Sequence, residues 1–262
     1  MHIQVAALRT ITSERTRHLV ARDKQQSITE YAQQHITRRQ TEIEQALAAL
    51  VQHKKDISVP LFVTLPEFFW NIRWDALKND EELHNLTECY LDQLPQRINT
   101  ILGAFPKDKY GGIILLAGTV ATLVETAQKG IYEALNYCLI GNNIRKIKSG
   151  SAEMSMWPKH HTSWVDFGPQ VGESGDIIAY KLSPSLGVAV LKTSTCAPEH
   201  NTVQGYGSHI DNDMIKECPF SINICLDYTR LSASEQQNQP GRVLPLWRHG
   251  NVGGSQPDRD KL

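Results

Sequence analysis

The sequence has few of the features that mark a secreted or membrane-bound protein. It contains five cysteines in 262 residues, with no CxxC pair, which argues against a disulfide framework and against a zinc site built from four cysteines. The first apolar run, Ile3 to Leu8, is too short for the core of a signal peptide. No run approaches the roughly 20 apolar residues of a membrane span. We therefore expect a soluble protein of a reducing compartment, the cytoplasm.

A bias toward charge of one sign is also missing. Lys and Arg number 27 and Asp and Glu number 28, so the formal net charge is −1. Nothing in this balance indicates a nucleic-acid partner or binding to an anionic membrane. Apolar residues make up 40% of the chain and charged residues 21%, which is typical of a globular protein that buries a sizeable core.

Apolar and polar patterns predict strands alternating with helices. Ser27-Ile28-Thr29-Glu30 and Thr41-Glu42-Ile43-Glu44 have the spacing of capping boxes, and the helix should end near His53. Another helix should open near Asp80, and Gly141-Asn142-Asn143 predicts a hairpin turn. Strands are expected at 2–8, 60–65, 112–124, 132–140, 144–148, 176–182, 186–193 and 220–225. This order predicts an α/β (α+β) fold with helices layered on a sheet.

The composition changes near the carboxyl end. From about Ser232, the residues Gln, Ser, Gly, Pro and Arg dominate. We expect a domain over residues 1–231, followed by a poorly ordered polar tail over residues 232–262.

Three residues stand where chemistry is expected. Glu67 follows a buried strand, Lys159 follows the predicted hairpin, and Cys225 ends an apolar strand. Loops converge where the strands of layered α/β sheets end. A carboxylate can take the thiol proton, a lysine can stabilise the thiolate or an oxyanion, and the thiolate can attack a carbonyl carbon. These three side chains are sufficient for acyl transfer without a histidine or a cofactor.

The chain resembles the nitrilase, or carbon–nitrogen hydrolase, superfamily. The matching segments are Leu65-Pro66-Glu67-Phe68-Phe69, Lys159-His160-His161 and Ile224-Cys225-Leu226-Asp227, in the family's order. The resemblance covers roughly residues 1 to 230. It implies an α-β-β-α sandwich that hydrolyses a small non-peptide amide or a nitrile. Glu67 would be the general base, Lys159 the oxyanion stabiliser and Cys225 the nucleophile. The family usually pairs such domains, which implies a homo-oligomer.

Several features depart from the family pattern. Lys159 and Cys225 are 66 residues apart, which indicates an insertion. The family often has a second glutamate soon after the lysine, where Asp166 and Glu173 are the nearest acids here. Arg230 stands one place beyond the family's usual arginine, and the chain continues for 37 residues after Cys225. We expect a chain incomplete at its carboxyl end, with weak or no activity.

Alternative interpretations remain open for each group. Phe68, Phe69 and Leu226 are candidates to contact substrate, although the aromatic residues after Glu67 suit a core equally well. A Cys-His hydrolase would pair Cys225 with a histidine, and a third hypothesis is an inactive scaffold of the same fold. The candidate histidines are His160, His161, His200 and His209. These histidines with Asp211 and Asp213 do not have the spacing of a known zinc site, so we expect no metal.

Overall fold

The structure is a computed structural model that describes residues 2–10, 21–54, 56–146, 152–159, 161–163, 166–194, 220–222, 224 and 242–244. The helices are α1 (Ile28–Gln52), the 3-10 helix η1 (Trp74–Ala76), α2 (Asp80–Ala104) and α3 (Lys107–Tyr110). The strands are β1 (Gln4–Ala7), β2 (Leu61–Thr64), β3 (Ile113–Glu125), β4 (Ile131–Lys146), β5 (Ala152–Pro158), β6 (Gln170–Ser174), β7 (Ile177–Lys181), β8 (Gly187–Leu191), β9 (Phe220–Ile222) and β10 (Arg242–Leu244).

An eight-stranded mixed sheet organises the described residues. Its strands lie in the order β1-β2-β3-β4-β8-β7-β6, and β5 pairs with β4 beside this path. β1, β2 and β3 are parallel, which requires crossovers, and α1 and α2 supply them. β4 runs antiparallel to β3 and to β5. The expected general α/β class is therefore present.

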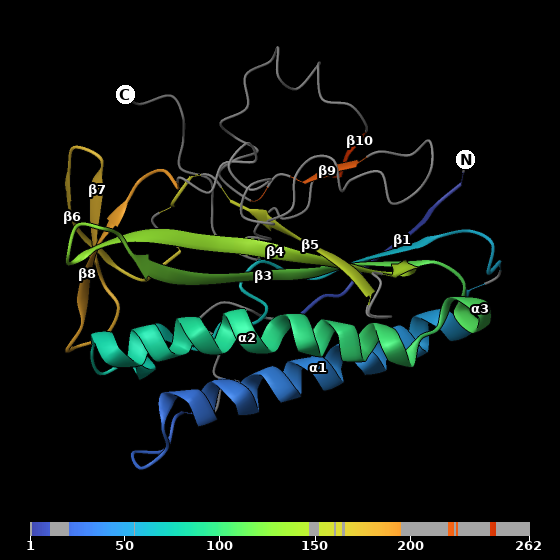
Figure 1. Ribbon diagram of the computed structural model, residues 1–262, viewed down its shortest axis with the longest axis horizontal. Helices are drawn as coiled ribbons and strands as arrows, with labels where there is room; N and C mark the ends of the chain where they lie inside the picture. The colour runs from blue at the N-terminus through green and yellow to red at the C-terminus, as the bar shows by residue number, and fades with distance from the viewer. Residues whose placement is uncertain are drawn as a thin grey trace, which may run out of the picture.

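Both faces of the central strands are buried. α1 and α2 lie along one face, as Figure 1 shows, and alternate residues of the strands pack against them. The residues between these point to the opposite face, and they are also apolar and buried. Phe62, Ile114, Leu116 and Ile140 are at most 1% exposed. The sheet is therefore an inner layer of the fold.

β9 and β10 form a separate two-stranded parallel sheet. β10 falls within residues 232–262, the predicted polar tail, and the remainder of that stretch lies outside the described residues. Across the described ranges, the helices are all too short or too polar to cross a membrane.

α1 confirms one capping box and shows that the other prediction was wrong. The Ser27 side chain accepts from the backbone N–H of Glu30, whose side chain accepts from the Ser27 N–H. Thr41 lies in the middle of the same helix, where its hydroxyl donates to the Thr37 carbonyl. The helix continues because the apolar stripe through Ile43 and Leu47 is unbroken. It ends at His53 as expected.

The predicted hairpin turn at Gly141-Asn142-Asn143 was also wrong. These residues lie inside β4, and the antiparallel partner β5 begins at Ala152. Gly141 is needed for close packing, because a Cβ there would lie 2.8 Å from Cγ2 of Ile98 in α2. Asn142 and Asn143 bond backbone groups with their side chains, the second through the Ile113 N–H at 2.7 Å.

Substituting Gly141 should therefore lower stability through overpacking. We expect Gly141→Ala to lower the free energy of unfolding by about 1–3 kcal/mol, measured by urea denaturation. Gly103, near the end of α2, is the matched control, since a Cβ there meets nothing within 4 Å. Gly103→Ala should leave stability unchanged or raise it by up to about 1 kcal/mol. Equal effects of the two substitutions would refute this account of Gly141.

A basic cluster on α1, in which His35 and Arg39 are buried, packs against the segment that follows β2. Arg39 places its guanidinium 4.7 Å from the ring centre of Phe69 and bonds Glu42 at 2.6 Å. Arg38 donates to Nδ1 of His35 at 2.9 Å. Burial, with the charges of Arg39 and Arg38, lowers the pKa of His35 from 6.5 to about 3. His35 is therefore neutral in the folded state near neutral pH.

This shift makes stability depend on pH in a defined window. Below pH 6.5 the unfolded chain protonates His35 while the folded chain does not, so stability falls from about pH 6.5 down to about 3. Between pH 7 and pH 5 the expected loss from this residue is about 2 kcal/mol. Urea denaturation at both pH values should show that His35→Gln removes this difference. His53→Gln, at the exposed end of α1, should not remove it.

Candidate active site

Glu67 is held by a strained turn at the carboxyl end of β2. The next residue, Phe68, has a φ of 60°, which is unfavourable for a side chain of this size. The Phe68 N–H donates to Oγ1 of Thr119 in β3 at 3.0 Å. Backbone strain of this kind persists only where surrounding contacts enforce it, and it is frequent at functional sites.

Contacts with β3 hold the strained turn at Phe68 in place. The pairing of β3 with β4 shifts register between Leu116 and Thr119, and Gly118 has a φ of 75° there. A Cβ on Gly118 would lie 2.8 Å from the Pro66 carbonyl oxygen. Trp70 donates its indole N–H to the Ala117 carbonyl at 2.6 Å. The bulge thus allows the turn that carries Glu67 to pack closely on the sheet.

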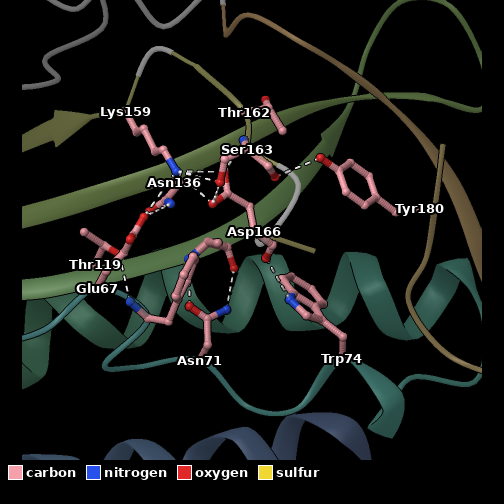
Figure 2. A network of polar contacts seen from close by, with 12 residues as sticks. Glu67, Asn71, Trp74, Thr119, Asn136, Lys159, Thr162, Ser163, Asp166 and Tyr180 are labelled. Carbon is pink, nitrogen blue, oxygen red and sulfur yellow. Dashed lines mark hydrogen bonds and ion pairs between the residues drawn. The ribbon is translucent and has the colours of Figure 1, made fainter. Parts of the chain in front are cut away.

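Lys159, which is distant from Glu67 in the sequence, contacts it in the folded structure. It follows β5 directly, and its backbone N–H donates to the Asn136 carbonyl of β4 at 2.7 Å. Its Nζ lies 3.2 Å from Oε1 of Glu67, although the two residues are 92 positions apart. The exposed fractions of the two side chains are 1% and 5%. Figure 2 shows the contact within a larger polar network.

Asp166 contacts the same ammonium. Its two carboxylate oxygens lie 2.8 and 2.9 Å from Nζ of Lys159. They also accept from the hydroxyl of Ser163 at 2.8 Å and from its backbone N–H at 2.9 Å. The Asp166 side chain is fully buried. These donors hold the Asp166 side chain in place against Lys159.

The segment that carries Asp166 is anchored on both sides. The Trp74 indole donates to the Asp166 carbonyl at 3.1 Å, and the Tyr180 hydroxyl donates to the Ser163 carbonyl at 2.9 Å. The buried ring of Phe167 packs between these two aromatic residues, with ring centres 5.3 and 5.7 Å away. The Asp166 carboxylate is therefore held by a rigid local structure.

Asn136 links Glu67 to Lys159. Its side-chain Nδ2 donates to Oε1 of Glu67 at 3.1 Å, while its backbone carbonyl accepts from Lys159. Asn136 is 2% exposed and pairs with Ala121 of β3. Asn71 bonds both backbone groups of Ala121, at 2.8 and 2.9 Å. The central strands thus determine the distance between the acid and the amine.

Two carboxylates and one ammonium therefore share a site that excludes water. Charged groups this deeply buried contribute little to net stability, since apolar residues of similar volume often do as well or better. Clusters of this kind occur frequently at catalytic sites. An ammonium held this way is positioned to stabilise an oxyanion, and a carboxylate beside it can accept and return a proton.

The structure describes four of the six predicted site residues. Glu67 and Lys159 lie together, whereas Cys225 and Leu226 lie outside the described residues. Phe69 is fully buried in the core on the helix side, and Phe68 is partly buried against that core. Of the two acids after Lys159, Asp166 reaches the lysine, and Glu173 instead pairs with Lys192.

Of the four candidate histidines, the structure describes His161. His161 forms an isolated backbone bridge with Thr193, and His160, His200 and His209 lie outside the described residues, as do Asp211 and Asp213. Where the structure describes the chain, no three His, Cys, Asp or Glu side chains gather as metal ligands would.

Sequence reasoning missed Asn136, Thr119 and Ser163. The first two are buried polar residues with apolar neighbours inside long strands, where a buried amide or hydroxyl needs a partner. That exception to the apolar pattern was a usable signal. Ser163 offered no such signal, because it lies in a short polar segment.

Comparisons with models of protein families, with curated proteins and with solved structures find no match to this chain. The resemblance described above therefore depends on the three sequence segments and on the contacts of Glu67 and Lys159.

Removing the ammonium should leave two buried carboxylates uncompensated. We expect Lys159→Met to lower the free energy of unfolding by about 3–5 kcal/mol at neutral pH, measured by urea denaturation. Adding Asp166→Asn to Lys159→Met should recover part of the loss, because one of the two charges is then gone.

Lys192→Met is the matched control. Lys192 pairs with Glu173, but the two side chains are 33% and 50% exposed, so the loss should be below about 1 kcal/mol. If both lysine substitutions had the same effect, the buried cluster would not carry the charges assigned to it.

Proposed function

We propose that the chain is a carbon–nitrogen hydrolase of the nitrilase type, which hydrolyses a small non-peptide amide or a nitrile through a thioester on Cys225. Glu67 acts as general base, Lys159 stabilises the oxyanion and Cys225 is the nucleophile. The observation that carries the proposal is the buried contact of 3.2 Å between Lys159 and Glu67.

Three features of the structure support this proposal. Glu67 lies just beyond the carboxyl end of β2, which is parallel to β1 and β3, and Lys159 lies just beyond β5, which pairs with β4. Loops from distant parts of the chain therefore converge at this site. The central strands are buried on both faces, as an α-β-β-α sandwich would require. Ile224, which directly precedes Cys225, is fully buried.

The reaction with an amide follows from these roles. Glu67 takes the thiol proton, and the sulfur of Cys225 attacks the carbonyl carbon, forming a C–S bond while the Lys159 ammonium stabilises the negative oxygen. Glu67 then gives the proton to the nitrogen, and the C–N bond breaks to release an amine or ammonia. Water, deprotonated by Glu67, attacks the thioester, and the acid leaves as the thiol re-forms.

Asp166 takes the place that the family's second glutamate has after the lysine. Its two contacts with Nζ orient Lys159, so Asp166 is a positioning residue. We also propose that the enzyme is cytoplasmic and works as a homo-oligomer, both of which follow from the resemblance and the composition.

The cysteines that the structure describes are poor nucleophiles. Burial raises the pKa of Cys89 and raises that of Cys138 to about 12. Neither thiol is therefore expected to compete with Cys225 for an alkylating reagent at neutral pH, and peptide mass spectrometry can measure Cys225 separately.

The proposal predicts which substitutions abolish turnover. Ammonia release from a panel of small amides and nitriles should fall by about 10²–10⁴-fold in Glu67→Gln, and Cys225→Ala should abolish it. Alkylation of Cys225 by iodoacetamide should slow in Glu67→Gln, because the thiol loses its base. Glu173→Gln is the matched control and should behave as the wild type, since Glu173 pairs with Lys192 at the surface.

Other outcomes would contradict the proposal in distinct ways. Turnover that survives Cys225→Ala would exclude the thioester. A loss in a His160, His161, His200 or His209 variant as large as in Cys225→Ala, with Glu67→Gln tolerated, would indicate a Cys-His hydrolase. No ammonia release from any substrate, with Cys225 as unreactive as a free thiol, would indicate an inactive scaffold.

A further inference from the structure

Asn136 has a buried atom that the mechanism above does not use. Its Nδ2 donates to Glu67, which fixes the orientation of the carboxamide, because a carboxylate oxygen can only be paired with the donor end. The other end, Oδ1, is buried and has no hydrogen-bond partner among the described residues. It belongs to the same planar group that touches Glu67, so it lies within the site.

A buried carbonyl oxygen without a donor is unfavourable by about 1–3 kcal/mol. Such atoms are rare in folded proteins and call for a physical explanation. Asn136 is 2% exposed and its backbone is fixed in β4 by Lys159 and Ala121, so it cannot turn to solvent. A ligand that brings an N–H into the site would satisfy the atom.

We propose that Asn136 is a specificity-determining residue whose Oδ1 accepts an N–H from the substrate, so that the site selects carboxamides over nitriles. The inference rests on the proposed function. In the proposed mechanism the Lys159 ammonium stabilises the oxygen of the amide, and Asn136 adds an acceptor for the amide nitrogen. A nitrile has no N–H and would leave Oδ1 unpaired.

Two alkylating reagents isolate this interaction. Iodoacetamide and iodoacetonitrile react alike, since the thiolate sulfur attacks the methylene carbon and iodide leaves, but only the amide reagent carries N–H groups. The ratio of their rates at Cys225, measured by peptide mass spectrometry and divided by the ratio for glutathione, reports the preference of the site. We expect the wild type to favour the amide reagent.

In Asn136→Leu this preference should fall about fivefold, the effect of one hydrogen bond. Asn136→Ser is a second variant that removes the same acceptor if the leucine disturbs folding, and circular dichroism should show that the variant analysed is folded. Thr119→Val is the matched control. It removes the bond that holds Phe68, so both rates should fall while their ratio stays constant.

An unchanged ratio in a folded Asn136 variant would overturn the inference and leave the hydrolase proposal standing. Failure of the hydrolase proposal looks different, because Glu67→Gln would then leave both alkylation rates at Cys225 unchanged. A wild-type ratio equal to that of glutathione, with Glu67→Gln slowing both reagents, would likewise count against Asn136 alone.

Discussion

The ammonium of Lys159 is the group on which the arrangement of the site depends. It lies within 3.2 Å of oxygens from both Glu67 and Asp166, with all three side chains almost fully buried. Without it, two carboxylates would face each other in a region that excludes water, which is strongly unfavourable. The position of Glu67 after β2 is therefore coupled to that of Lys159 after β5. Asp166 is also held by donors other than Lys159. Ser163 donates to its carboxylate through both its hydroxyl and its backbone N–H, and Trp74 donates to its backbone carbonyl.

β4 determines how Glu67 and Lys159 are placed relative to each other. Asn136 bonds Glu67 through its side chain and Lys159 through its backbone, and its neighbour across the sheet is clamped by Asn71. The distance between acid and amine is thus determined by strand pairing, which is among the most rigid elements of a protein. The strained turn at Phe68 and the bulge at Gly118 then aim Glu67 toward that position. Rigid support of this kind is what a preorganised catalytic group requires.

The sequence predicted much of this architecture, and its errors have physical causes. Glu67 could be selected because it follows an apolar strand and Lys159 because it follows the predicted hairpin, and each matches a family segment. The turn at residues 141–143 was misplaced because Gly-Asn-Asn satisfies turn chemistry, whereas here the glycine admits Ile98 and the asparagines bond backbone groups. Asp166 could not be separated from Glu173 by spacing alone, because only the fold shows which acid reaches the lysine. The contacts of Asn136 with Glu67 and Lys159 depend on strand register, which is a tertiary property.

The buried charges also bear on the choice between a hydrolase and a scaffold. A scaffold requires only the fold, and apolar residues at positions 67, 159 and 166 would fill the same space without desolvating three charged groups. The turn at Phe68 and the unpaired oxygen of Asn136 are unfavourable as well. These features are independent of one another, and each lowers stability at the same place. Their common location is explained if a ligand supplies the missing interaction and if the charges act on it. A scaffold gives no reason for three buried charged groups, so the cluster around Lys159 supports the hydrolase proposal over the scaffold.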